Sequence, residues 1–292
     1  MEQLKKIFPS MRYFEELDTL PQNYRWFITQ ENKVIGFDNN ELTNKDVELL
    51  STFLKPHNIH LPQPSELEQL WRKRISQPIE KKVSPFRFVY FLIKSDQIDT
   101  QLFKEAIPNT YGKDVPILWE NEHEGIIIEE KPAIPEESIS YEQIIDVLMS
   151  DLYVNISFFV GPYIDTLSEL DQYYESFVTS SNIAFTYSDQ SVVTYIDAIS
   201  YHFVDQAEQN FLDSVKQLVL KELIEDHELL HSIKVFIQSN LNVTVASKKL
   251  HLHRNSLQYR LDKFVDKTGI DVRQFNEAMA VYLVILSMMH KE

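Results

Sequence analysis

The chain has 292 residues, of which 43% are hydrophobic and 25% charged, and its formal net charge at pH 7 is −16. It contains no cysteine, which excludes disulfides, cysteine-ligated zinc, iron–sulfur clusters and thiol catalysis. Only five glycines occur, and neither a G-x-x-x-x-G-K-[ST] nor a G-x-G-x-x-G phosphate loop is present.

A membrane location is not expected from the distribution of apolar residues. A transmembrane helix needs about 18 consecutive apolar residues, and the most apolar stretch, AMAVYLVILSMM, is shorter than that. The start, MEQLKKIFPSMRYFEEL, lacks the long apolar segment of a signal peptide. We therefore expect a cytoplasmic protein without a membrane partner.

Residues 1–80 are predicted to form a small α/β module. Two short strand-like runs, YRWFIT and KVIGFD, are joined by QEN and followed by a helix over ELTNKDVELLSTFLK, which Thr43 or Asn44 can cap. A loop over 56–64 leads to a second helix, SELEQLWRKRI, and to a linker, SQPIEKKVSP. The role of this module stays open between sensing a small-molecule effector and acting as a dimerisation or packing module.

Residues 84–188 are predicted to form one sheet with helices on a face, because strand-like and helix-like runs alternate along them. The expected strands are FRFVYFLI, a hairpin over VPILWENEHEGIIIEE, YVNISFFVG and a last strand, NIAFTY. The expected helices are DTQLFKEAI (99–107), SYEQIIDVLMSDL, which Ser140 can cap, and DTLSELDQYYESFVTS (165–180). Residues 189–226 are predicted to be an acidic helical connector.

Residues 227–292 have the pattern of a helix-turn-helix domain. A helix over HELLHSIKVFIQ is followed by the two helices of the motif. The first of these is short and can be capped by Thr244, and the second begins at Arg254 or Asn255 after a tight turn over HLH. Two short helices joined by a three-residue turn are typical of this motif. The inner face of the second helix is predicted to consist of Leu257, Leu261, Phe264 and Val265.

The charge of this segment differs from that of the rest of the chain. Residues 231–292 contain nine Lys or Arg and five Asp or Glu, whereas the remainder contains nineteen and thirty-nine. Arg, Asn and Gln side chains can read base edges, and basic side chains can neutralise phosphates. We expect base contacts from Arg254, Asn255, Ser256, Gln258 and Tyr259, and phosphate contacts from Thr244, Lys248, Lys249, His253, Arg260 and Lys263. The alternative is a helical-bundle cap with a solvated basic face.

The stretch LLHSIKVFIQSNLNVTVASKKLHLHRNSLQYRLDKFVDKTGID resembles the C-terminal helix-turn-helix of the PucR/CdaR family of bacterial transcriptional regulators. Its core, HRNSLQYRLDKF, matches the family pattern nearly position by position, with Ser256 in place of the usual Thr and Phe264 in place of the usual Ile. The resemblance implies a transcriptional regulator that binds double-stranded DNA.

The resemblance extends towards the middle of the chain. In this family a degenerate GGDEF-like domain often precedes the helix-turn-helix, and NISFFVGPYIDTLSELDQYYESF is similar to the family's G-x-x-Y-x-x-L-x-x-L-x-x-S-[YF] stretch. Where an active cyclase has Gly-Gly-[Asp/Glu]-Glu-Phe, this chain has NEHEG at 121–125. Because the paired glycines that admit a nucleotide are missing, the resemblance implies the fold without the cyclase activity.

The stretch HELLH matches the H-E-x-x-H signature of zinc metalloproteases. His227 and His231 share a helix face, but no H-x-x-G-x-x-H continuation follows, and the later acidic residue, Glu277, lies beyond the helix-turn-helix. We therefore predict that both histidines lie on the solvated face of the first helix. The other histidine pairs are predicted to be a turn near phosphate (His251 and His253) and a surface loop (His57 and His60).

The predicted fold class is α+β and multidomain, with a small N-terminal α/β module, a GGDEF-like mixed-sheet domain and a C-terminal all-α helix-turn-helix domain. The predicted function is that of a sequence-specific transcriptional regulator, not an enzyme, with no cofactor and no metal. Expected partners are double-stranded DNA, an unidentified small-molecule effector and a second copy of the chain. The second copy is expected because residues 273–290 are apolar nearly all round and need cover, which the helical connector or a second copy can supply.

Two alternatives to this function stay open. One is a catalytic nucleotide cyclase or phosphodiesterase, or another nucleotide-binding signalling protein, with a helical tail. The other is a protein-interaction module whose helix-turn-helix does not contact DNA, which the acidic body of the chain would suit. An exposed basic strip on the second helix favours DNA binding, and burial of that strip favours the interaction module.

Overall fold

The computed structural model describes residues 2–13, 23–29, 33–56, 61–77, 83–94, 98–132 and 140–289. By contacts the chain divides into two compact units, of which the first comprises residues 1–73, 91–128 and 137–156 and the second residues 74–90, 129–136 and 157–292. The predicted surface loop with His57 and His60, the QEN connection and part of the predicted linker lie outside the described residues.

The N-terminal part of the first unit is an antiparallel sheet with the strand order β1-β3-β2-β4 and two helices, in agreement with the predicted strands and helix. Thr43, one of the two predicted caps, begins α2 with a capping box: its hydroxyl accepts the Asp46 N–H at 3.3 Å, and the Asp46 carboxylate accepts the Thr43 N–H at 2.9 Å. The elements are β1 (Arg12–Tyr13), β2 (Tyr24–Ile28), β3 (Val34–Asp38), β4 (Lys55–Pro56), α1 (Glu2–Ile7) and α2 (Asn44–Phe53).

A second sheet has the strand order β6-β7-β5-β8-β9. The antiparallel pairing of β6 with β7 confirms the predicted hairpin, and β8 pairs with β9 in parallel, so the sheet is mixed. All residues of β8 are buried, which explains its apolar sequence, because a strand covered on both faces loses the alternation of a half-exposed one. The strands are β5 (Phe86–Ile93), β6 (Ile117–Trp119), β7 (Glu124–Glu130), β8 (Ile156–Val160) and β9 (Val192–Thr194), and the helices are α4 (Thr100–Tyr111), α5 (Tyr141–Leu152) and α6 (Leu170–Tyr187).

Helix α3 (Glu66–Ser76) is held in the first unit by one buried carboxylate. Glu68 is 3% exposed, and it accepts the Ile117 N–H at 3.1 Å and a hydrogen bond from Lys104 Nζ at 2.7 Å. A buried carboxylate is costly unless it is paired and hydrogen-bonded. These bonds therefore fix α3 beside β6 and α4.

The predicted end of the middle segment and the predicted start of the helical connector are wrong. NIAFTY, predicted as the last strand, forms the end of α6, and the last strand is β9, in a segment predicted to be helical. Tyr174, Phe177, Ala184 and Tyr187 are buried at helical spacing, and the Phe177 ring packs 5.6 Å from that of Phe88 in β5. The short apolar alternation in NIAFTY suits a strand or a helix, and packing on the sheet selects the helix.

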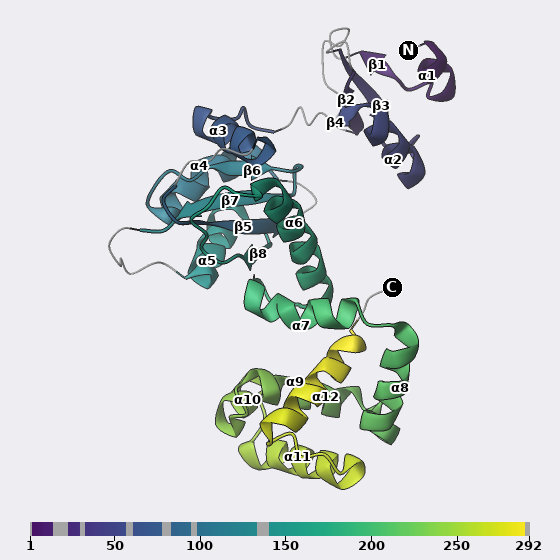
Figure 1. Cartoon of the computed structure of the whole chain (residues 1–292), viewed down its shortest axis with the longest axis vertical. Helices are drawn as coiled ribbons and strands as arrows, with labels where there is room; N and C mark the ends of the chain where they lie inside the picture. Colours follow the sequence, from purple (N-terminus) through teal and green to yellow (C-terminus); the bar gives the residue numbers. More distant parts are fainter. Residues whose placement is uncertain are drawn as a thin grey trace. The chain divides into compact units, whose positions relative to one another are not determined.

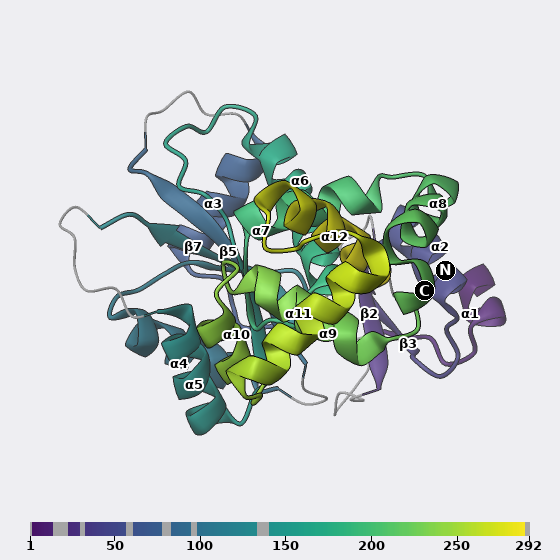
Figure 2. The same cartoon turned by 90° about the horizontal axis from the view of Figure 1, so that it is seen from below.

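The remainder of the second unit is helical, as Figures 1 and 2 show. Helices α9, α10 and α11 contact one another, and α11 lies across α9 in Figure 2. The elements are α7 (Tyr195–Asp205), α8 (Gln209–Leu220), a 3-10 turn (Lys221–Leu223), α9 (His227–Gln238), α10 (Val243–Lys249), α11 (Arg254–Thr268) and α12 (Phe275–Ser287). Their shared core includes Leu230, Ile233, Phe236, Leu257, Leu261, Phe264, Val281 and Ile285.

Helix α12, whose apolar surface was expected to be covered by the helical connector or by a second copy of the chain, is covered largely within its own chain. It contacts α7, α8 and α9, and Val281, Val284, Ile285 and Leu286 are buried there. Tyr282 and Leu283 of the same run stay half-buried. Within the described ranges, no helix, α12 included, is both long and apolar enough to cross a membrane.

Candidate nucleic-acid interface

Helix α10 begins at Val243, and its cap is Asn242 rather than the predicted Thr244, which was wrong. The Asn242 side-chain oxygen accepts the N–H groups of Thr244 at 2.9 Å and Val245 at 3.1 Å, so that two otherwise unpaired donors are satisfied. Ala246 is fully buried where α10 meets α9. The side chains of Thr244, Lys248 and Lys249, three of the predicted phosphate contacts, are exposed.

The turn between α10 and α11 determines where the second helix begins. His251 has a left-handed backbone (φ 53°), and His253 caps α11 by accepting the Asn255 N–H on its Nδ1 atom at 3.3 Å. Helix α11 begins at Arg254, as predicted. The capping role of His253 was missed in the sequence, because Ser, Thr, Asp and Asn are the residues that usually supply this acceptor.

The first two turns of α11 present polar side chains to solvent. Leu257, Leu261 and Phe264 are fully buried, which confirms three of the four predicted inner residues, and Val265 is half-buried. All five predicted base contacts are exposed, namely Arg254, Asn255, Ser256, Gln258 and Tyr259. The helix is therefore anchored by one face and leaves the opposite face available to a groove of DNA.

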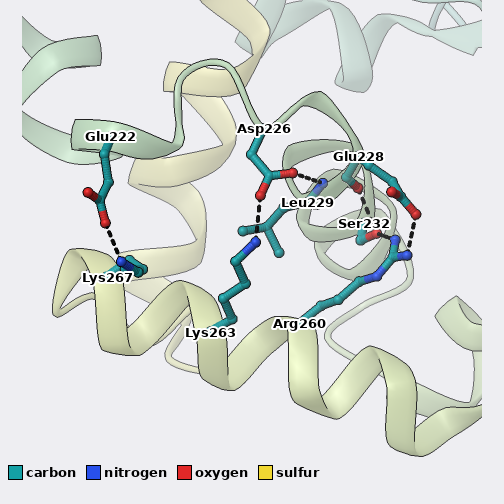
Figure 3. A network of polar contacts seen from close by, with 8 residues as sticks. All are labelled: Glu222, Asp226, Glu228, Leu229, Ser232, Arg260, Lys263 and Lys267. Carbon is teal, nitrogen blue, oxygen red and sulfur yellow. Dashed lines mark hydrogen bonds and ion pairs between the residues drawn. The ribbon is translucent and has the colours of Figure 1, made fainter.

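One flank of α11 carries a row of three ion pairs to the acidic segment before and at the start of α9, as Figure 3 shows. The pairs are Lys267 with Glu222 at 2.6 Å, Lys263 with Asp226 at 2.7 Å, and Arg260 with Glu228. Arg260 also donates a hydrogen bond to the Ser232 hydroxyl at 2.6 Å. The row therefore ties residues 260–267 of α11 to the 3-10 turn and to the start of α9.

These pairs engage two of the predicted phosphate contacts. Arg260 and Lys263 already have carboxylate partners, and the hydrogen bond from Lys263 holds the pKa of Asp226 below its usual value. Lys267 lowers the pKa of Glu222 in the same way. Sequence reasoning missed the three acidic residues, because each lies more than thirty positions before its partner and no local pattern joins them.

An open groove of about 580 Å³ lies between this row and the exposed face of α11. Acidic residues and predicted base contacts both line this groove. Asp226 and Glu228 stand on one side, and Asn255, Ser256 and Tyr259 stand on the other. The predicted base contacts and the acidic side chains thus share one surface.

The two histidines of HELLH are exposed on α9, as predicted for the solvated face of this helix. Leu229 and Leu230 between them are buried in the helical core. In the part of the chain that the structure describes, no group of three or more His, Cys, Asp or Glu side chains is placed to hold a metal ion.

Comparison with known proteins identifies the helical segment. Residues 229–286 match the family model described as the PucR C-terminal helix-turn-helix domain. The chain is 28% identical to the uncharacterized protein YxkF of Bacillus subtilis (strain 168) over 98% of either protein.

Two further relatives match only the C-terminal part. The chain is 34% identical over 68 residues to the DNA-binding transcriptional activator AdeR of Bacillus subtilis (strain 168), which covers 23% of this chain and 16% of AdeR. It is 29% identical over 66 residues to the carbohydrate diacid regulator of Escherichia coli (strain K12), which covers 23% of this chain and 17% of that protein.

The matched residues contain all of α10, the capped turn and α11, which are the elements that form the exposed polar face. The C-terminal segment of this chain is therefore similar to the helix-turn-helix domain of PucR/CdaR-type transcriptional regulators.

Proposed function

We propose that this chain is a sequence-specific DNA-binding regulator of transcription, that it is not an enzyme, and that α11 is its recognition helix. The observation that carries the proposal is the exposed run from Arg254 to Tyr259 at the start of a helix whose other face is fully buried. Side chains at this place in a helix-turn-helix reach base edges in the major groove. Exposure of this run also favours DNA binding over the interaction-module alternative.

The proposed contacts fall into two groups. Base edges are contacted by Arg254, Asn255, Ser256, Gln258 and Tyr259, all of which are exposed. Phosphates are contacted by Thr244, Lys248, Lys249 and His253, which lie exposed on α10 or at the cap of α11. For Arg260 and Lys263, which were predicted to contact phosphates as well, the proposal requires that a phosphate replaces the carboxylate of Glu228 or Asp226.

Residues 84–188 are proposed to be the family's GGDEF-like domain without cyclase activity, between the 1–80 module and the 189–226 connector that leads to the 227–292 domain. Gly125, the one glycine of NEHEG, supports this. A side chain there would meet the Leu118 carbonyl oxygen at 2.6 Å and the Phe91 ring at 2.9 Å. This glycine therefore serves close packing of the hairpin and does not replace the glycines of a nucleotide site.

A homodimer is proposed to form through the outer surface of α7, α8 and α12. Phe203 is 71% exposed, Phe211 61% and Leu218 74%, and Phe203 and Phe211 border an apolar groove of about 250 Å³ that Leu283 of α12 also lines. Contiguous exposed apolar surface is typical of a protein interface. A dimer with two-fold symmetry would bind an operator with inverted symmetry.

The experiment that tests the function has two steps. Genome-wide mapping of the sites bound by the chain in cells identifies its operators, and footprinting with purified protein then compares the wild type with Arg254→Ala and Asn255→Ala. We expect protected sites that either substitution weakens, while Arg25→Ala, an exposed arginine on β2, leaves them unchanged. Full protection by both recognition-helix variants would contradict the proposal.

A further inference from the structure

A second groove in the helical part shares no lining residue with the groove beside α11. It lies between residues 188–190, α9 and the end of α12, and its volume is about 430 Å³. Small-molecule sites are typically roughly 300–1,000 Å³ in volume. The groove is therefore large enough for a small ligand.

One wall of this groove is a polar stripe on α9. His227, His231, Lys234 and Gln238 follow one another at intervals of four, three and four residues, so they share one helix face. The lysine stands between a histidine and the glutamine. The stripe therefore places a cation at its centre with hydrogen-bonding side chains on either side.

Lys234 is held in an environment that favours an anion. It is half-buried, and this burial lowers the pKa of its ammonium group, while the charge of Asp189 opposes the shift. Its Nζ atom lies 2.8 Å from the sulfur of Met289, which is a weak acceptor. The ion pairs found among the described residues do not involve Lys234. A partly desolvated ammonium in this state gains from a charged acceptor.

The other residues that line the groove indicate which further chemical groups the ligand has. Leu230, Val235, Ile285, Met288 and Met289 make them apolar. Asp189 also lines the groove and would repel a second negative charge. The surroundings therefore select one negative charge joined to an apolar body.

We propose that this groove binds a small monocarboxylate with an apolar body. Its carboxylate faces Lys234 and accepts hydrogen bonds from His231 or His227, and its apolar body covers Ile285 and Met288.

The position of the groove connects it with regulation, and this part rests on the proposed DNA-binding function. Residues 188–190 join α6, which packs on the sheet, to β9, whereas α9 is the first helix of the DNA-binding domain. A ligand that touches both adds contacts between the sheet and α9. Binding of the ligand is therefore expected to change the affinity for DNA.

Isothermal titration calorimetry of the full chain without DNA tests the site. Hexanoate and 4-phenylbutyrate are the probes, with hexanamide as the uncharged control and acetate as the control without an apolar body. We expect saturable binding of at least one probe and of neither control. Lys234→Met should lower the affinity by about tenfold or more, because a charge-assisted hydrogen bond is lost. Lys45→Met, on exposed surface of α2, should keep the wild-type affinity.

A second variant keeps the test decisive if Lys234→Met does not fold. Asp189→Asn should raise the affinity for hexanoate, because it removes a like charge from the groove. The site is disproved if neither probe binds, if hexanamide binds as well as hexanoate, or if neither variant changes the affinity. A chain that binds the probe and binds no DNA keeps the site and disproves the proposed function, whereas a bound probe without effect on DNA affinity disproves the regulatory part alone.

Discussion

The Nζ atom of Lys263 lies 2.7 Å from Oδ2 of Asp226, and the other carboxylate oxygen of Asp226 accepts the Leu229 N–H at 3.2 Å. One carboxylate therefore caps α9 and holds α11, the proposed recognition helix. Arg260 and Lys267 form parallel pairs on the same flank of α11. This flank is thus neutralised, and DNA is expected to meet the exposed run from Arg254 to Tyr259 that borders it.

The base-contact assignment predicts a loss of specificity. Arg254→Ala or Asn255→Ala should lower the affinity for the operator by about 1–3 kcal/mol and relax the preference for sequence at one position. Fluorescence anisotropy with the operator and with single-base variants of it measures both effects, and Arg25→Ala is the control. Equal loss on operator and on unrelated DNA would move the residue to the phosphate-contact group.

The ion-pair row predicts different salt dependences for different cations. Lys248→Ala or Lys249→Ala should weaken binding to all DNA alike and reduce the slope of log K against log salt by about one. Glu228→Gln should steepen that slope, because it releases Arg260 to a phosphate. Glu225→Gln, which removes the same charge at an exposed position nearby, is the matched control. If both glutamine variants give the same slope, Arg260 does not exchange its partner for DNA.

We expect the contribution of Asp226 to the stability of the folded chain to depend on pH. Its pKa is lowered in the folded chain, so its contribution is present above the ordinary value of 3.8 and is lost as the pH falls through the lower folded value. Asp226→Asn keeps a capping side chain and loses the ion pair, which should cost at most about 1 kcal/mol because both partners stay partly exposed to solvent. Asp226→Ala also loses the cap, which should cost about 1 kcal/mol more.

Urea denaturation at pH 7 and at pH 3 measures these differences. The difference in the free energy of unfolding between the wild type and Asp226→Asn should be smaller at pH 3 than at pH 7. An unchanged difference at the lower pH would show that the carboxylate contributes through packing rather than through its charge.

The apolar surface of α7 and α8 predicts the oligomeric state. Light scattering at micromolar concentration should give about twice the chain mass of 34.4 kDa for the wild type. Phe211→Glu should give monomers with unchanged helix content, because this side chain is 61% exposed and charge would be buried only in the dimer. Phe53→Glu, at a 70% exposed position on α2, is the control and should stay dimeric. A wild type of single-chain mass with and without DNA would disprove the dimer.

Because the two histidines of HELLH are exposed, we expect that replacing them hardly changes DNA binding. His227→Ala combined with His231→Ala should change the free energy of unfolding by no more than about 0.5 kcal/mol and keep the operator affinity, as for most exposed positions. Metal analysis of the wild type and the double variant tests whether the two histidines bind zinc. A stoichiometric zinc ion that the double variant loses would support the metalloprotease alternative.

The sequence by itself determined the local structure of the DNA-binding domain. The inner face of α11 and the start of this helix at Arg254 follow from apolar spacing and from the polar turn before it, all within a few turns of chain. The hairpin of β6 and β7 and the caps Thr43 and Ser140 were predictable for the same reason. Such features depend on neighbours in sequence, which a single sequence displays.

Only the tertiary structure decided which distant residues meet. NIAFTY becomes helical because α6 packs its buried residues on the sheet, and α12 finds its cover on α7, α8 and α9. The carboxylates of Asp226 and Glu228 reach Lys263 and Arg260 because α11 crosses the start of α9. These contacts join residues far apart along the chain, and their geometry follows from how whole elements pack rather than from any local pattern.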